Sequence, residues 1–214
     1  MIRVENVDVF NFEGAIRGLR NPMNSWDKSD SVKCYTNADC QGICKNAFCG
    51  WCIGKNDLTL MKKLYKAGTE HRKYLRQIFV SMDIVAPLYW WKEFDTYKVG
   101  TVSNSCSTMH KIAAKEFELD DFSHEHLGFW LGTLENLVDE LNVVREFYIK
   151  TKDKKYWWQM IQLLPSSYNQ RRTITMTYEN VVSMIKQREH HKLDEWREFA
   201  EVLKTLPYIK EIME

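Results

Sequence analysis

Apolar residues recur at intervals of three and four between residues 124 and 151, and no other feature constrains the fold of this chain as strongly. The stripe comprises Leu127, Trp130, Leu131, Leu134, Leu137, Leu141 and Val144. Such spacing places side chains along one face of an α-helix, which a folded protein buries against other elements. The pattern predicts a long amphipathic helix over residues 124–151, and therefore a fold in which packed helices predominate.

Strand signals lie mainly in the first half of the chain. Residues 78–85 alternate, with Ile78, Val80, Met82 and Ile84 on one side of the predicted strand. Further strands are predicted within the first ten residues and at 173–177. A short turn or helix is predicted at 14–20. Helices are predicted at about 58–67, from 88 onward, 106–117, 153–164, 178–190 and 192–206. We therefore expect a single α+β domain over residues 1–214, helix-rich with a small antiparallel sheet.

Composition limits the classes of function. Of the 214 residues, 44% are hydrophobic, which is enough to form the core of one packed domain. The chain has 30 Lys plus Arg and 29 Asp plus Glu. A net charge of +1 argues against nucleic acid as the main partner, because duplex-binding domains carry a large basic excess. The N-terminus lacks a signal-peptide core and no apolar run approaches membrane-spanning length. We expect a soluble cytoplasmic protein without a membrane partner.

Cysteine is concentrated in one segment. Five of the 6 cysteines lie between residues 34 and 52, within a Cys-rich loop or insertion predicted at about residues 31–54. In a reducing cytosol, clustered thiols are more often metal ligands or free thiols than disulfides. Cys40, Cys44, Cys49 and Cys52 could hold structural zinc in tetrahedral geometry. Packed free thiols are the alternative, and a metal knuckle that contacts a partner molecule is a further one.

Hydroxyl and amide residues gather at the predicted entry to the helix at 106–117. Asn104, Ser105, Ser107 and Thr108 fall within five residues of one another. Free backbone N–H groups at a helix start bind anions, which predicts a phosphate site. The same residue types are also the favoured caps of any helix. The segment can thus be a phosphate site or a capped helix start.

Arginines mark two later segments. Arg171 and Arg172 follow Gln170, and Arg188 and Arg197 stand nine residues apart around two histidines. If the intervening residues turn back, such a pair can converge on one anionic ligand. The alternative is that both pair with neighbouring carboxylates, which at a surface contributes under about 1 kcal/mol.

These segments resemble the flavin-dependent thymidylate synthase (ThyX) family. The resemblance covers roughly residues 58–200, and in the first half Trp90-Trp91 occupies the place of the helix after the family's core strand. Asn104, Ser107 and Met109 fall where the family has Asn, Ser and Arg. The later matching residues are Leu164-Pro165, Tyr168, Gln187-Arg188 and Asp194-Glu195-Trp196-Arg197.

The resemblance implies a ThyX-like enzyme that methylates dUMP to dTMP. It implies FAD as cofactor, NADPH and methylenetetrahydrofolate as co-substrates, and a homotetramer with sites at subunit interfaces. By resemblance, Arg197 is catalytic and binds the pyrimidine edge, and Ser105, Ser107 and Gln170 bind the rest of the nucleotide. The cofactor residues implied are His71, Lys92, Asn104 and Arg188.

The chain departs from the family at four arginine positions, two of them in one motif. The family's Arg-His-Arg falls on Lys92-Glu93-Phe94, its closing arginine falls on Met109, and a further arginine falls on Glu179. Lysine lacks the planar fork of arginine, and Phe and Met bind no anion. The candidates to compensate are Lys98, Lys111, Arg171 and Arg172. The alternative function is therefore a ThyX-fold pyrimidine-nucleotide-binding protein with changed or lost chemistry.

Overall fold

The computed structural model describes residues 2–35 and 50–214, and it divides the chain into two compact units. Unit 1 contains the chain up to Arg3, Ile84–Thr96 and Asn104–Arg172. Unit 2 contains Val4–Asp83, Tyr97–Ser103 and Thr173–Glu214. Each unit thus draws on separate stretches of sequence, and the single domain over residues 1–214 stays a prediction.

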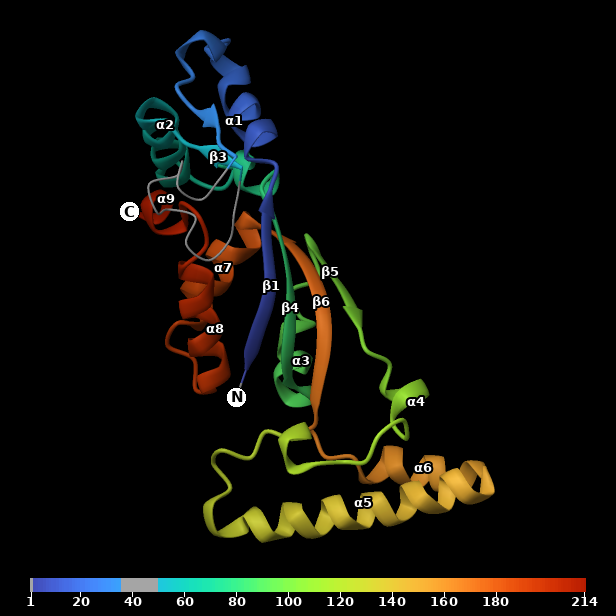
Figure 1. Ribbon diagram of the computed structural model, residues 1–214. Coiled ribbons are helices and arrows are strands. Elements are labelled where there is room, and N and C mark those ends of the chain that lie inside the picture. The colour runs from blue at the N-terminus through green and yellow to red at the C-terminus, as the bar shows by residue number, and fades with distance from the viewer. Residues whose placement is uncertain (1, 36–49) are drawn as a thin grey trace. The chain divides into compact units, whose positions relative to one another are not determined.

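A four-stranded sheet has the strand order β1-β4-β6-β5. The strands are β1 (Arg3–Phe10), β4 (Phe79–Pro87), β5 (Thr101–Ser105) and β6 (Asn169–Thr177). Neighbouring strands run in opposite directions, as Figure 1 shows. In β4 the predicted alternation is confirmed, since Val80, Met82 and Ile84 are all buried. The strand predicted at 173–177 is likewise found, although β6 begins four residues earlier, at Asn169.

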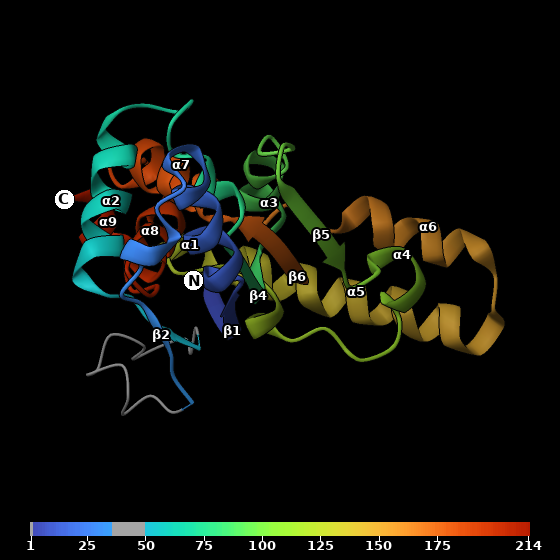
Figure 2. The same ribbon diagram turned by 90° about the horizontal axis from the view of Figure 1, so that it is seen from above.

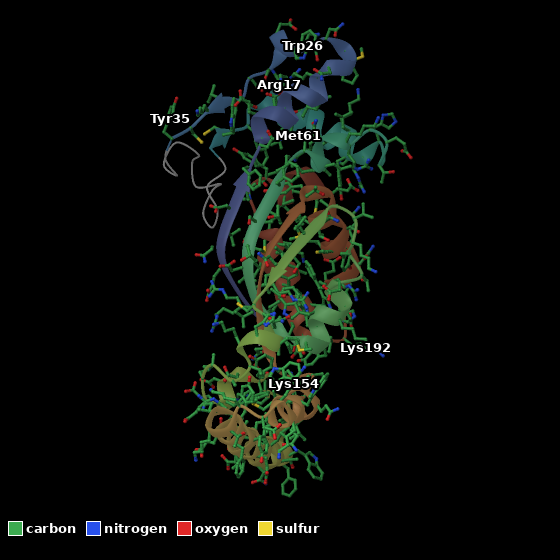
Figure 3. All side chains as sticks on the ribbon, turned by 90° about the vertical axis from the view of Figure 1, so that its right-hand side faces the viewer. Arg17, Trp26, Tyr35, Met61, Lys154 and Lys192 are labelled. Carbon is green, nitrogen blue, oxygen red and sulfur yellow. The ribbon has the colours of Figure 1, made fainter. Side chains whose placement is uncertain are left out.

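Unit 2 consists largely of helices packed in pairs. Helices α7 and α8 pack together, and α9 contacts both α2 and α8 (Figure 2). Their apolar faces enclose Trp196, Tyr178 and Met61, and Figure 3 labels Met61 in α2. The helices are α1 (Phe12–Arg20), α2 (Lys55–Lys66), α7 (Tyr178–Arg188), α8 (Asp194–Lys204) and α9 (Ile209–Met213).

Unit 1 is built around a helical hairpin. Helices α5 (Leu131–Thr151) and α6 (Lys154–Leu163) lie against each other, with Asp153 capping α6 by accepting a hydrogen bond from the Lys155 N–H. Two shorter helices complete the unit, α3 (Leu88–Phe94) and α4 (Thr108–Lys111). The core of the hairpin comprises Ile112, Phe117, Phe122, Leu134, Val138, Leu141 and Met160. The helix-rich α+β class with a small antiparallel sheet is confirmed.

Two predicted helices differ from the structure. Helix α5 begins at Leu131 rather than at residue 124, because Gly128 has a φ of +50° and begins a 3-10 turn that precedes the helix. The helix predicted at 106–117 shrinks to the single turn of α4, and β5 precedes it. No described helix combines the length and the apolar character that crossing a membrane requires.

The segment predicted as an insertion begins and ends in a short pair of strands. Strand β2 (Val32–Lys33) pairs antiparallel with β3 (Trp51–Cys52). Cys40, Cys44 and Cys49 lie outside the described residues. Within residues 2–35 and 50–214, no group of three or more His, Cys, Asp or Glu side chains could hold a metal ion. Structural zinc stays a prediction.

A buried carboxylate fixes the base of this segment. Asp57 is fully buried and accepts hydrogen bonds from Arg20 Nε at 2.6 Å, Ser29 Oγ at 2.7 Å and Ser31 Oγ at 2.6 Å. Burial alone raises the pKa of the Asp57 carboxyl, but hydrogen bonds from Ser31, Ser29 and Arg20 together hold this pKa below its ordinary value. Asp57 is therefore charged and satisfied, and it ties α1 and α2 to β2.

The N-terminus of α2 is stabilised by Asp30, a residue far from the helix in sequence. Asn56 and Asp57 are of the residue types that cap helices, but both lie inside the first turn of α2. Asp30 accepts from their backbone N–H groups, at 2.8 Å and 3.1 Å respectively. A carboxylate near a helix N-terminus stabilises the free N–H groups there. The cap therefore comes from the other end of the inserted segment.

We predict opposite effects from two Gly→Ala changes. Gly100 has a φ of +77°, and an added Cβ lies 2.7 Å from Asn180 Oδ1, so Gly100→Ala should lower the free energy of unfolding by about 1–2 kcal/mol. Gly132 lies inside α5 with open space around it, and Gly132→Ala should raise that free energy by about 0.5–1 kcal/mol. Urea denaturation of both variants measures the difference. Equal stabilities for the two variants would contradict this reading of the backbone.

Candidate functional site

The predicted site residues are divided between the two units. Unit 1 holds Lys92, Asn104, Ser105, Ser107 and Gln170, and unit 2 holds His71, Arg188 and Arg197.

In unit 1, the hydroxyl-rich segment is a capped helix start. Ser107 precedes α4, and its Oγ accepts a hydrogen bond from the His110 N–H at 3.2 Å. Ser105, at the end of β5, is exposed, as is the neighbouring Asn104. The capping alternative is therefore observed for Ser107, whose hydroxyl hydrogen is still able to donate.

Gln170 connects this segment to strand β6. Its Nε2 donates to the Cys106 carbonyl at 3.0 Å and to Thr108 Oγ1 at 3.1 Å. The backbone adds a parallel link, because the Cys106 N–H donates to the carbonyl of Arg171 at 2.9 Å. Gln170 thus holds residues 106–108 in one conformation.

Arg172 extends the same network and is the residue that sequence reasoning placed only among several candidates. Its Nε donates to Gln170 Oε1 at 2.9 Å, and its Nη1 donates to Asp95 Oδ1 at 2.8 Å. The guanidinium carbon lies 4.3 Å from the ring centroid of Trp91, a cation–π distance. Trp91 in turn donates from Nε1 to the Gln170 carbonyl at 2.9 Å. The available signal was the strand periodicity, which puts residues 170 and 172 on the same face of β6.

Lys92 and Phe94 stand on α3, at the positions where the sequence resemblance places two arginines. The Lys92 side chain is exposed and makes no ion pair with any described residue. Phe94 is only 2% exposed and stacks on Trp90 with ring centroids 5.3 Å apart. The last position of the motif therefore belongs to an aromatic core and is unable to contact a ligand.

In unit 2, Arg188 is enclosed by aromatic rings. Its guanidinium carbon lies 4.6 Å from the ring centroid of Trp196 and 5.5 Å from that of Tyr97. Its Nε donates to Tyr97 Oη at 2.9 Å, and Tyr97 Oη donates to Gln187 Oε1 at 2.8 Å. Arg188 is thus held rigidly, with its planar group stacked rather than extended into solvent.

Arg197 is exposed and anchors the connection between α7 and α8. Its Nη1 donates to the carbonyls of His191 at 2.7 Å and Lys192 at 3.0 Å. Lys192 is labelled in Figure 3, in this connection. Nε and Nη2 of Arg197 have no acceptor among the described residues, so the guanidinium edge that these two nitrogens form can still bind a ligand.

His71 takes no part in the hydrogen bonds described above for Arg188 and Arg197. Its side chain is exposed, and its neighbour Arg72 forms an ion pair with Glu179, with Nη2 to Oε1 at 2.7 Å. Arg72 Nε also donates to Glu179 Oε2 at 3.1 Å, so the pair is bidentate. Glu179, where the family resemblance places an arginine, therefore neutralises Arg72.

Burial changes the titration of one phenol near the unit 1 network. Burial, with the nearby negative charge of Asp121, raises the pKa of Tyr168 above its ordinary value, although Lys115 opposes this. Tyr168 therefore stays protonated at neutral pH. Its carbonyl accepts from the Leu88 N–H at 3.0 Å and so positions the start of α3.

Comparison with known proteins gives a clear answer for the fold. No family model matches the sequence, and no curated protein matches it. The crystal structure of the flavin-dependent thymidylate synthase ThyX from Helicobacter pylori, complexed with FAD and dUMP, matches with a TM-score of 0.71 at 14% identity. That match covers 99% of this chain and 96% of the other. A second structure of Helicobacter pylori ThyX with FAD and dUMP matches with a TM-score of 0.68 at 14% identity, covering 100% of this chain and 97% of that one.

These matches run over essentially the whole chain of both proteins. At 14% identity they show the fold and not the chemistry. The chain therefore has a ThyX-like fold, and its sequence diverges far from the solved structures it resembles.

Proposed function

We propose that this protein is a flavin-dependent thymidylate synthase-like enzyme that methylates dUMP to dTMP. The observation that carries the proposal is the match of the entire chain to two ThyX structures that hold FAD and dUMP. The hydrogen-bonded segment at residues 105–108 supports it, since it offers hydroxyl donors of the kind that bind phosphate. Methylenetetrahydrofolate supplies the carbon and NADPH the reducing equivalents in this proposal.

The donors present in the chain fit a dinucleotide cofactor. Lys92 and Asn104 are exposed donors in unit 1, and His71 is an exposed imidazole in unit 2. Arg188 supplies a rigid cation whose stacking on Trp196 fixes its orientation. Cations and amides are the groups that hold a pyrophosphate. FAD, when bound, supplies the redox chemistry, and the residues of this chain bind and orient it.

The nucleotide is assigned to four residues. In this proposal Ser105, Ser107 and Gln170 bind or position the phosphate end of dUMP, and Arg197 binds the pyrimidine. Arg197 suits this role because the Nε–Nη2 edge of its exposed guanidinium remains available as a pair of hydrogen-bond donors. We further propose that the protein is a homotetramer, and light scattering of the purified protein tests this mass. The proposed location is the cytoplasm.

Purified protein tests the proposal directly. We expect flavin absorbance in the protein as isolated or after addition of FAD, and binding of dUMP in calorimetry. With NADPH and methylenetetrahydrofolate present, chromatography should detect dTMP. Absence of flavin uptake together with absence of dUMP binding would overturn the proposal.

A second candidate is a nucleotide-binding protein with this fold and without the chemistry. The buried Phe94 favours it, because a core aromatic stands where the family resemblance places a flavin-binding arginine. This candidate predicts dUMP binding without NADPH oxidation. Measurable dTMP formation would exclude it.

A further inference from the structure

One cation in unit 1 is built into a polar network but still has unused donors. Arg172 has a side chain that is 14% exposed, lies against Trp91, and donates to Gln170 and Asp95. These two hydrogen bonds use Nε and Nη1. Nη2 has no acceptor among the described residues, although a guanidinium has five N–H donors in total. Arg172 therefore combines a fixed position with spare capacity to bind an anion.

The hydrogen bonds around Arg172 leave several donors that an anion can accept from. Gln170 accepts from Arg172 through Oε1, so its Nε2 must point at Thr108 and at the Cys106 carbonyl. Thr108 Oγ1 thus accepts from Gln170, and Ser107 Oγ accepts from the His110 N–H. Both hydroxyls keep their own hydrogen as a donor. Donors of this kind suit a phosphate, which only accepts hydrogen bonds when fully ionised.

The present partner of Arg172 is exchangeable. The Asp95 side chain is 51% exposed and meets Arg172 Nη1 at 2.8 Å, so water reaches one side of the ion pair. The exposed side of Asp95 is screened by water, so this pair contributes less to stability than a fully buried ion pair does. A dianionic phosphate offers three oxygens and more charge than a carboxylate does. The phosphate can therefore replace Asp95 at small cost to the fold.

We propose that Arg172 binds the phosphate of the nucleotide substrate, together with the hydroxyls of Ser107 and Thr108, and that Asp95 holds Arg172 until the phosphate displaces it. The inference rests on the proposed function and extends it. Met109, where the family resemblance places an arginine, carries no charge, and Arg172 supplies one from β6. Gln170 then acts as a positioning residue, because it orients both Arg172 and the segment at residues 106–108.

Calorimetry with dUMP, deoxyuridine and inorganic phosphate tests this assignment on the full-length protein. Arg172→Gln should weaken dUMP binding at least about tenfold, the loss expected when a charge-assisted hydrogen bond is removed. The same variant should change deoxyuridine affinity less than about twofold. Inorganic phosphate should compete with dUMP in the wild type and lose this competition in the variant. Arg171→Gln is the matched control, since strand alternation puts residue 171 on the face of β6 opposite to residue 172, and it should leave dUMP affinity within about twofold.

Asp95→Asn supplies a second readout that does not depend on the folding of Arg172→Gln. Removing the competing carboxylate should tighten dUMP binding by about two- to tenfold. Unchanged or weaker binding in Asp95→Asn would overturn the exchange, and unchanged binding in Arg172→Gln would overturn the assignment of the phosphate. If the wild type binds dUMP but the dUMP affinities of Arg172→Gln and Asp95→Asn do not change as expected, the inference fails and the proposed function stands. If the wild type binds neither dUMP nor deoxyuridine, both fail.

Discussion

Asp57→Asn should be the most destabilising conservative substitution among those considered for this protein. The variant keeps the size of the side chain but removes the charge that Arg20 faces at 2.6 Å, and Arg20 is itself buried. Breaking one side of a buried ion pair costs about 3–5 kcal/mol, because the remaining charge is left without compensation. For a chain of this size, that loss corresponds to a melting temperature lower by about 6–20 °C. Differential scanning calorimetry measures it.

The control for Asp57→Asn is an ion pair in solvent. Lys150 and Glu146 meet at 3.1 Å on α5, with side chains 71% and 61% exposed. Glu146→Gln should change the free energy of unfolding by less than about 1 kcal/mol. Equal effects of the two substitutions would show that burial of the Arg20–Asp57 pair does not set its contribution.

The pH dependence of the free energy of unfolding also tests the role of Asp57. Folding lowers the pKa of Asp57, so its contribution is fully present above the pKa that the carboxyl has in the unfolded chain. That contribution is lost as the pH falls through the lower pKa of the folded state. Asp57→Asn should therefore flatten the acid side of the stability curve and leave its neutral side parallel to that of the wild type. An acid limb as steep as that of the wild type would contradict this account.

Arg197→Ala should have the largest effect on nucleotide binding. Hydrogen bonds from a charged donor contribute about 1.5–3 kcal/mol, so the proposed loss in dUMP affinity is about 10- to 150-fold. The Arg197 side chain is exposed, and among the residues that the structure describes it bonds only backbone carbonyls of the connection between α7 and α8. The fold should therefore survive, with a melting temperature within a few degrees of the wild type.

Two further variants distinguish a direct loss of dUMP binding from a change in the connection between α7 and α8. Lys192→Ala removes a neighbouring exposed cation while keeping the carbonyl that Arg197 binds, and it should leave dUMP affinity within about twofold. Arg197→Lys retains the charge without the planar fork and should fall between the wild type and Arg197→Ala. Calorimetry with dUMP measures all three. If Arg197→Ala binds dUMP as tightly as the wild type does, the pyrimidine assignment is wrong.

Local patterns predicted the elements that depend on neighbours in sequence. The alternation in β4 and the apolar stripe of α5 both follow from residues two to four positions apart, and both are found. The start of α5 was missed because Gly128 takes a positive φ that no periodicity reports. Strand β5 was missed because most of its residues are exposed and therefore show no apolar alternation.

The site was predicted as a set of residue types and not as a set of contacts. Arg188 is separated by 91 positions from Tyr97, whose hydroxyl oxygen accepts the Arg188 Nε hydrogen bond. Arg172 and Asp95 are 77 positions apart. Such pairings depend on how strands and helices assemble, and a single sequence contains no spacing rule for them. The residue resemblance located the arginines, whereas only the structure shows which of their donors remain available.

The strand pair β2–β3 has a consequence for how this protein can change over evolution. Its two strands and the carboxylates of Asp30 and Asp57 hold both ends of the intervening segment close together. For a segment whose ends are already joined, doubling its length costs only about 0.6 kcal/mol in closure entropy. Insertions, deletions and new binding motifs can therefore accumulate between β2 and β3 with little effect on the fold that surrounds them.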